Sequence, residues 1–260
     1  MDTKQILELY DQLRKEVRLF GMRREEAPHL VRHISRGGEG MIIYSNLDAS
    51  NAEEAIREQI AHFEELERDF EWVVFQHDAP PDLKDRLLAH GFEAEDPEAI
   101  MVLDLDDVPP ALLEPVNHDV RRIDGLDRID DVMAVREQVW QRDFSSTAQS
   151  LLNRLKDDPH NLGLYVAYVD EKPVSTAQIT FYEQGAFAGL GGAGTLPGYR
   201  GRGLYTALLA VRVQEAKRRG VRFVDADASP MSRPILEKFG FQWLSEAHTC
   251  VWQVKQTSAG

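Results

Sequence analysis

The chain has a single cysteine, no long apolar run and a deficit of basic side chains. Cys250 is the only cysteine among 260 residues, which excludes an intrachain disulfide and a cysteine-rich zinc site. The 30 Lys and Arg residues face 44 Asp and Glu residues, so the formal net charge is −14. This charge disfavours nucleic acid and anionic membrane surfaces, because binding to both depends on Lys and Arg. It modestly favours a cationic acceptor, although solubility alone also explains it.

Targeting and metal-binding patterns are also missing from the sequence. No apolar run approaches the roughly 18 residues that a membrane span needs. The N-terminal residues lack the apolar core of a signal peptide, and Ile6, Tyr10, Leu13 and Val17 recur there at helical spacing. The eight histidines show no HExxH or similar spacing, so we expect no metal. We therefore expect a cytoplasmic protein without a metal cofactor.

The order of elements predicts an α/β or α+β fold in two parts. A proline-bearing stretch over residues 108–115 indicates a linker, and the length allows two domains, which we place at 1–110 and 119–260. In the second half, strand-like and helical runs alternate, with an antiparallel portion. We predict strands over 120–123, 164–169, 174–182, 186–195, 221–228 and 248–254, and helices over 126–140, 148–155, 204–219 and 230–239.

Two glycine patterns overlap within residues 189–205, and each could bind a phosphate. The first, Gly189–Gly194, reads G-x-G-x-x-G, a dinucleotide fingerprint that requires a helix immediately afterwards. A turn at Pro197-Gly198 follows instead. We therefore reject the fingerprint, and with it a nucleotide-dependent oxidoreductase. Small residues there allow a bulge or a close contact against the backbone.

The second pattern, Arg200-Gly-Arg-Gly203-Leu-Tyr205, directly precedes a helical run. Its glycines permit close backbone approach, and the first amides of the helix would converge on an anion. Arg200 and Arg202 add charge that can reach phosphate oxygens. Taken alone, the pattern is equally consistent with a glycine turn flanked by solvated arginines.

The surrounding sequence adds to this pattern. The loop, its helix, the strand over 221–228 and the pair Gly240-Phe241 stand in the order of the GNAT superfamily of N-acyltransferases. Residues 119–255 resemble that family, whose phosphate loop reads R/Q-x-x-G-x-G/A. The resemblance implies a mixed central sheet flanked by helices, with acetyl-CoA as co-substrate. It also implies that backbone amides from Gly201 to Tyr205 bind the pyrophosphate, while the strand end at Thr195-Leu196 pairs with pantetheine and polarises the thioester. The implied cofactor-binding residues are Thr195, Leu196, Arg200, Gly201, Arg202, Gly203, Leu204 and Tyr205.

Two positions depart from the family pattern. Tyr205 stands where Gly or Ala is usual, so its ring could line the cleft. Leu236 stands where the family often carries the tyrosine that protonates the departing thiolate. The protonation step is therefore left open.

Several polar side chains are candidates for the acid–base chemistry. Glu183, Asp225 and Asp227 could deprotonate an acceptor amine directly or through water. A solvated or strand-end carboxylate is the simpler interpretation of each. Ser232 could hydrogen-bond the thiolate, although Ser229 and Ser232 also flank a short helix and could cap it. We expect Cys250 to be a buried, inert thiol, and the four tryptophans to lie in the core.

The first half looks like a degenerate copy of the second. Gly91-Phe92 corresponds to Gly240-Phe241. Shifting the first half by the number of residues that aligns these two pairs also aligns Asn51-Ala-Glu-Glu54 with Arg200–Gly203. Ser50 and Glu53 have capping-box spacing, which would satisfy the following helix, and the glutamates would repel a pyrophosphate. The first half is then a GNAT-like domain without the cofactor-binding loop. Two unrelated α/β segments are the alternative.

These observations predict an acyl-CoA-dependent N-acyltransferase that transfers acetyl to a primary amine by direct attack in a ternary complex. The acceptor is left open among amino acids, polyamines, antibiotic amines and protein N-termini. A homodimer is compatible with the sequence. The alternative function is a non-catalytic acyl-CoA-binding module, since the usual tyrosine is missing.

Overall fold

The computed structural model describes residues 1–35, 38–125, 128–183 and 185–254. By contacts, the chain divides into two compact units. The first unit comprises Met1–Ile100, Ala228–Arg233 and the segment from Trp243 onward; the second comprises Met101–Asp227 and Pro234–Gln242. The linear division at 1–110 and 119–260 remains a prediction about domains, because the contacts group the C-terminal strand with the first unit.

The first unit is a sheet with two helices packed together on it. Strands β1, β2 and β3 are antiparallel, β3 and β4 are parallel, and β12 pairs antiparallel with β4. Phe63, Phe70 and Trp72 are fully buried in its core. The elements are α1 (Thr3–Glu16), β1 (Met22–Ala27), β2 (Leu30–Ser35), β3 (Gly40–Ser45), α2 (Ala52–Glu65), β4 (Phe70–Phe75), α3 (Leu83–Ala89), β5 (Glu93–Ala94) and β12 (Gln242–Trp252).

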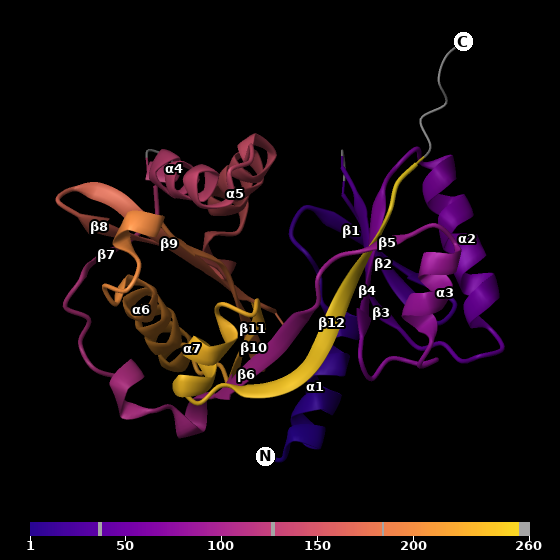
Figure 1. The fold of residues 1–260 in the computed structure, drawn as a ribbon, viewed down its shortest axis with the longest axis horizontal. Helices are drawn as coiled ribbons and strands as arrows, with labels where there is room; N and C mark the ends of the chain where they lie inside the picture. Colours follow the sequence, from indigo (N-terminus) through magenta and orange to yellow (C-terminus); the bar gives the residue numbers. More distant parts are fainter. Residues whose placement is uncertain (36–37, 126–127, 184, 255–260) are drawn as a thin grey trace, which may run out of the picture. The chain divides into compact units, whose positions relative to one another are not determined.

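The second unit is a mixed sheet with helices on both faces, in strand order β6-β11-β10-β9-β8-β7. Helices α4 and α5 cover one face of β8 and β9, and α6 lies on the other side (Figure 1). The elements are β6 (Glu98–Asp104), β7 (Asp119–Arg122), α4 (Ile129–Trp140), α5 (Ser145–Asp157), β8 (Leu162–Val169), β9 (Lys172–Phe181), β10 (Phe187–Thr195), α6 (Leu204–Arg218), β11 (Phe223–Ala228) and α7 (Arg233–Lys238). Short 3-10 turns, η1 (Leu105–Asp107), η2 (Pro110–Leu112), η4 (Pro159–Asn161) and η5 (Pro197–Tyr199), connect them.

The two halves repeat one order of elements. Three antiparallel strands are followed by a helix, a parallel strand and a second helix, as β1-β2-β3-α2-β4-α3 and again as β8-β9-β10-α6-β11-α7. The last strand of each half then pairs in the other unit, because β12 adds to β4 and β6 lies beside β11. The predicted mixed α/β fold with a repeated architecture is confirmed. Helix 126–140 begins at Ile129, and residues 126–127 lie outside the described part.

Two predictions about side chains were wrong. The capping box at α2 does not form, because Asp48 Oδ1 accepts from the Ser50 hydroxyl at 2.6 Å and Glu53 pairs with His90 at 2.9 Å. Trp140 and Trp243 are 40% and 41% exposed rather than in the core. Cys250 is buried as expected, and burial raises the pKa of its thiol to about 11.

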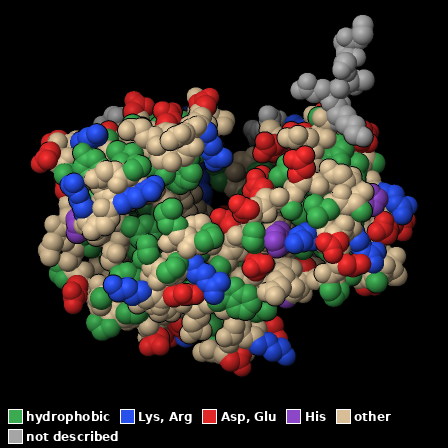
Figure 2. Space-filling view, in the orientation of Figure 1, with side chains coloured by type: hydrophobic (Ala, Val, Ile, Leu, Met, Phe, Trp, Pro, Cys, Tyr) green, Lys and Arg blue, Asp and Glu red, His purple; other side chains and the backbone are tan. Residues whose placement is uncertain are grey.

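The described helices include none with the length and apolar character that crossing a bilayer requires. Acidic and basic side chains are interspersed on the face seen in Figure 2, with carboxylates prominent over the first unit. The acidic balance of the sequence is thus spread over that face.

Candidate coenzyme-binding and acceptor site

The loop before α6 has the backbone of an anion-binding turn. Gly201 and Gly203 have φ angles of 75° and 79°, a region that favours glycine. Gly203 is the N-cap residue of α6, and no side chain caps this helix. The first-turn N–H groups therefore lack a side-chain acceptor, and the positive end of the helix dipole faces the loop. The predicted loop has the geometry that an anionic group needs.

His118 holds this turn in place. Its Nε2–H donates to the Arg202 carbonyl oxygen at 3.0 Å, which turns that oxygen toward the ring. A Cβ at Gly203 would lie 3.3 Å from the same ring. Glycine is therefore required at position 203 both by its φ angle and by the histidine beside it.

Three cations gather beside the turn. The Arg200 Nε–H donates to the Thr195 carbonyl at 3.1 Å, which ties that side chain to the end of β10. The Arg202 guanidinium lies 5.0 Å from the centre of the Tyr199 ring, and the Lys172 ammonium lies 5.6 Å from it. Lys172 comes from the start of β9, so folding adds a charge that the loop sequence does not contain.

Strands β10 and β11 separate next to this loop. Their parallel pairing ends at Leu190 and Ala226, although both strands continue. On its other side β10 bulges, since the register with β9 skips from Gly191 to Gly194, and Gly192 has a φ of 56°. The small residues do accommodate a bulge, as predicted. They lie within a strand, as the rejection of the dinucleotide fingerprint requires.

The strand end predicted to contact pantetheine is already engaged. The Leu196 N–H donates to Val174, and the Thr195 hydroxyl lies 2.7 Å from the Ser175 hydroxyl. Gly192 and Ala193 of β10 have no partner residue in the register with β9. The unpaired backbone of β10 therefore lies earlier in the strand than the sequence indicated.

A buried carboxyl lies beside the point of separation. Asp225 is 6% exposed, pairs in register with Gly189, and has one oxygen without a hydrogen-bond partner among the described residues. Burial, together with the neighbouring charge of Asp227, raises the pKa of Asp225 to about 7. The Tyr182 hydroxyl covers Gly189, where a Cβ would be only 2.4 Å away. Burial and both aspartates raise the Tyr182 pKa well above its usual value.

A buried arginine lies further along the same face of the sheet. Arg136, on α4, is 4% exposed, and its Nη2 donates to Gln178 Oε1 at 2.7 Å. Gln178 pairs in register with Gly191, and Gly189 and Gly191 are two apart, so both project to the face that carries Asp225. Burial lowers the Arg136 pKa to about 10.

The other sequence-predicted residues lie in different surroundings. Glu183 is exposed in the turn after β9, and Asp227 is also exposed. Ser232 hydrogen-bonds Ser229 and belongs to the stretch that groups with the first unit. Leu236 is 1% exposed, so it is a packing residue.

Tyr205 is half-buried at the start of α6, and burial raises the pKa of its phenol. Sequence reasoning overlooked His118, Lys172 and Arg136. Each is an isolated residue in its segment, and only the fold brings it to the loop or the bulge. A polar residue within an amphipathic helix, such as Arg136 in α4, was the one available signal.

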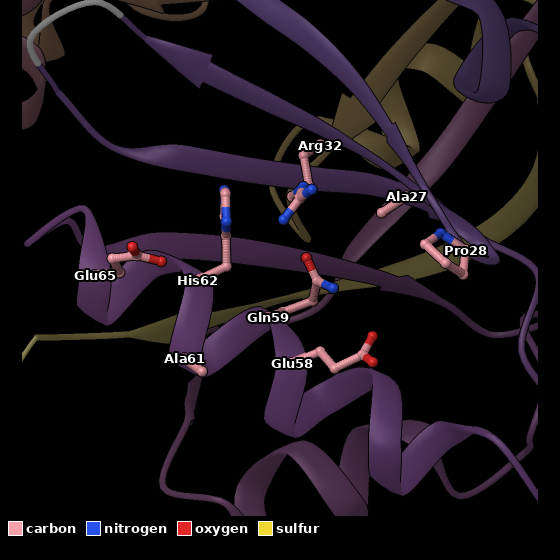
Figure 3. A pocket seen from close by; sticks show the side chains of 8 residues that line it. All are labelled: Ala27, Pro28, Arg32, Glu58, Gln59, Ala61, His62 and Glu65. Carbon is pink, nitrogen blue, oxygen red and sulfur yellow. The ribbon is translucent and has the colours of Figure 1, made fainter.

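A separate pocket of about 360 Å³ lies in the first unit between α2 and the β1–β2 hairpin. Figure 3 shows Arg32, Gln59 and His62 converging on it. The Arg32 Nε lies 3.5 Å from a Glu25 carboxylate oxygen, so this cation already has a counter-charge. The pocket contains none of the predicted coenzyme-binding residues.

The geometry defines a mixed sheet in which the parallel strands β10 and β11 stop pairing before either strand ends, followed by a glycine turn at the start of α6. Residues 129–241 match the sequence model of the Acetyltransferase (GNAT) family. The match runs from the first residue of α4 to the residue before β12. No curated protein matches the sequence.

Solved structures share the fold over nearly the whole chain. A GCN5-related N-acetyltransferase from Kribbella flavida has a TM-score of 0.70 at 16% identity, covering 98% of this chain and 97% of that one. A tandem GNAT protein from the clavulanic acid biosynthesis pathway has a TM-score of 0.59 at 15% identity, covering 97% and 89%. A GCN5-related N-acetyltransferase from Sphaerobacter thermophilus has a TM-score of 0.60 at 17% identity, covering 87% and 77%. The tandem architecture predicted from the sequence is thus found in a solved structure.

Proposed function

We propose that the protein is an acyl-CoA-dependent N-acyltransferase that transfers an acetyl group from acetyl-CoA to a primary amine. The observation that carries the proposal is the uncapped glycine turn at the start of α6, within a GNAT-family domain. Backbone amides from Gly201 to Tyr205 would hold the pyrophosphate, with Arg200, Arg202 and Lys172 beside it. The glycine at 203 fits this role, because a side chain there would be strained by the positive φ angle and would press against the His118 ring.

The chemistry requires a hydrogen-bond donor for the developing oxyanion and a base for the amine. The N–H groups of Gly192 and Ala193, in the bulge, are suited to the first task. Asp225 is suited to the second, since a pKa of about 7 allows it to accept a proton near neutral pH. The amine nitrogen forms a bond to the carbonyl carbon and the carbon–sulfur bond breaks. Asp225 takes the proton from nitrogen, and the thiolate takes one from water.

Leu236 cannot supply that last proton, because it is an apolar residue in the core. Tyr182, whose hydroxyl lies against Gly189, and Tyr205, in the first turn of α6, are the candidate phenols. A thiol of pKa about 8.5 is a fair leaving group that needs little help. We therefore expect Tyr182→Phe and Tyr205→Phe to retain turnover within tenfold at saturating acetyl-CoA. A hundredfold loss in either, with acetyl-CoA affinity intact, would identify that phenol as the acid.

Two measurements test the function. Calorimetry with acetyl-CoA should show one site per chain, and thiol release should depend on an added amine. Binding without amine-dependent release from any amine would favour the alternative, an acyl-CoA-binding module. The absence of acetyl-CoA binding would overturn the proposal.

A further inference from the structure

The buried arginine of α4 differs from a buried arginine elsewhere in this chain. Arg14, in the first unit, is 4% exposed like Arg136, and it donates to both carboxylate oxygens of Asp78 at 3.0 and 2.8 Å and to Asp11 at 2.7 Å. Arg136 has no such carboxylate among the described residues, and its Nε is buried without a hydrogen-bond partner. A buried cation without a counter-charge is costly unless a ligand supplies one.

The second unpartnered group on this face has the opposite sign when ionised. Asp225 is buried with one oxygen unsatisfied, at the end of the paired part of β10 and β11. No ion pair joins Arg136 to Asp225 among the described residues, and the charge near Asp225 is that of Asp227, which has the same sign. The face thus presents a cation and a carboxyl that do not pair with each other.

Their spacing follows from the strand. The Arg136 Nη2 lies against Gly192, where a Cβ would be 2.1 Å away, while Asp225 lies beside Gly189. The regular part of β10 from Gly189 to Gly191 spans about 7 Å at roughly 3.3 Å per residue, and the bulge at Gly192 follows it. Two hydrogen bonds of about 2.8 Å and a compact molecule that carries an amine and a carboxylate bridge such a gap.

We propose that the acceptor is a free amino acid, held with its carboxylate on Arg136 and its amine beside Asp225. This inference rests on the proposed function and specifies its acceptor. The amine would then lie where β10 and β11 separate, next to the bulge amides that would polarise the thioester. The reaction consumes an amino acid and acetyl-CoA and yields an N-acetyl amino acid and free CoA, with bond and proton changes as described above.

Gly192 and Gln178 would position Arg136 in this arrangement. Any side chain at Gly192 would displace the guanidinium, and Gln178 holds it through Oε1. The geometry disfavours a peptide N-terminus or a polyamine as acceptor, because neither has a carboxylate adjacent to the amine.

The experiment compares matched acceptors on the full chain. Thiol release from acetyl-CoA is measured with the proteinogenic amino acids, with their C-terminal amides and with the corresponding decarboxylated amines. For the preferred side chain, we expect kcat/KM for the amino acid to exceed that for its amide and its amine at least a hundredfold. Equal or better turnover of the amide or the amine would overturn the inference and leave the N-acyltransferase function standing.

Variants then assign the preference to Arg136. Arg136→Gln should lose the hundredfold preference for the acid while retaining acetyl-CoA affinity and turnover of the uncharged analogue, and Arg136→Lys should recover part of the preference. Arg212→Gln is the control, since Arg212 is also buried but donates to the backbone oxygens of Leu208 and Gln178. Its preference should be unchanged. An equal fall for acid and amide in Arg136→Gln would make this arginine merely structural and overturn the inference.

A direct binding measurement tests the inference even if none of the acceptors is acetylated. Calorimetry with the same amino acids, on the chain saturated with CoA, should show binding that the amides lack. No binding of any amino acid would overturn the inference, whereas failure of acetyl-CoA itself to bind would overturn the proposed function.

Discussion

The N-termini of α2 and α6 occupy the same place in the two repeats and differ in almost every feature that matters for an anion. Gly203 precedes α6 with a left-handed φ of 79°, whereas Asn51 precedes α2 with a φ of −109°. The first turn of α6 contains no acidic residue, while that of α2 contains Glu53 and Glu54. Glu53 is in turn held by His90, and that hydrogen bond lowers its pKa.

This contrast shows how little sequence separates the proposed phosphate-binding turn from an ordinary helix start. Both helices connect two parallel strands, so the topology is common to both. The two helix starts differ in the φ angle of the N-cap residue, which favours glycine before α6, and in the charge of the first helical turn. Topology provides the position of the site, and two or three residues determine whether an anion binds there.

The largest effect that we expect concerns β12, the last strand of the chain, which pairs with β4 in the first unit. Trp252 of β12 is 5% exposed and lies in the core with Phe70. Trp252→Ala should lower the free energy of unfolding by about 3–5 kcal/mol, measured by urea denaturation. Trp243→Ala, at the exposed start of the same strand, should change it by less than about 0.5 kcal/mol. Similar effects of both changes would mean that β12 does not contribute to the core of the first unit.

Gly203→Asp should give the start of α6 an acidic side chain, as the start of α2 has. The carboxylate would be placed where the α6 amides converge, in a backbone region that disfavours side chains, so acetyl-CoA affinity should fall at least a hundredfold, about 2.7 kcal/mol. Calorimetry on the folded variant measures this. Asn51→Asp is the matched change at the α2 N-cap and should leave the affinity unaltered, because α2 contains none of the proposed coenzyme-binding residues. Unchanged affinity in Gly203→Asp would remove this loop from the site.

The sequence predicted most elements of the second unit because their patterns are local. The strand over 164–169 and the start of α6 at Leu204 agree with the structure, since β-rich runs and a glycine before a helical stretch are visible in a short window. The exchange of β12 and β6 depends on pairing between distant segments, which no local pattern encodes. The capping box failed for a similar reason, because Glu53 found a partner in α3 rather than in its own turn.

For the candidate site, the sequence singled out the glycine turn and Asp225 but not His118 or Arg136. His118 lies just outside the predicted second domain, and Arg136 is one arginine among many in the sequence. His118 matters because it donates to the Arg202 carbonyl, 84 residues away. Arg136 matters because it is buried without a carboxylate partner among the described residues. Sequence spacing reveals neither fact.

One carboxyl in each unit, Asp225 in the second and Asp48 in the first, should make stability change with pH in opposite directions. The folded pKa of Asp225, about 7, is above its usual value of 3.8, so the native state retains a proton that the unfolded chain has released. Its contribution to stability is full below about pH 4 and is lost as pH rises to 7, about 2 kcal/mol of it between pH 5 and pH 7. Asp225→Asn should abolish that fall in urea unfolding free energies.

Asp48 of the first unit is the matched control for this test. A hydrogen bond from Ser50 lowers its pKa, so Asp48→Asn should remove stability that the wild type gains as pH rises above the acid range, the opposite sign. A parallel pH profile for Asp225→Asn and the wild type would show that the pKa of Asp225 is not raised in the native state.

The smallest expected effect compares the two histidines that brace the two helix starts. His118 donates to the Arg202 carbonyl in the second unit, and His90 pairs with Glu53 in the first. His118→Ala should free the turn to sample other conformations, since one hydrogen bond of this kind contributes about 0.5–1.5 kcal/mol. Acetyl-CoA affinity should then fall about three- to tenfold, with turnover at saturating acetyl-CoA nearly unchanged because the residue lies away from the bulge and Asp225. His90→Ala should leave affinity at the wild-type value, because the helix that it braces binds no phosphate. Equal losses from both histidines would indicate a general effect on stability, and no loss from His118→Ala would show that the turn is held by its glycines alone.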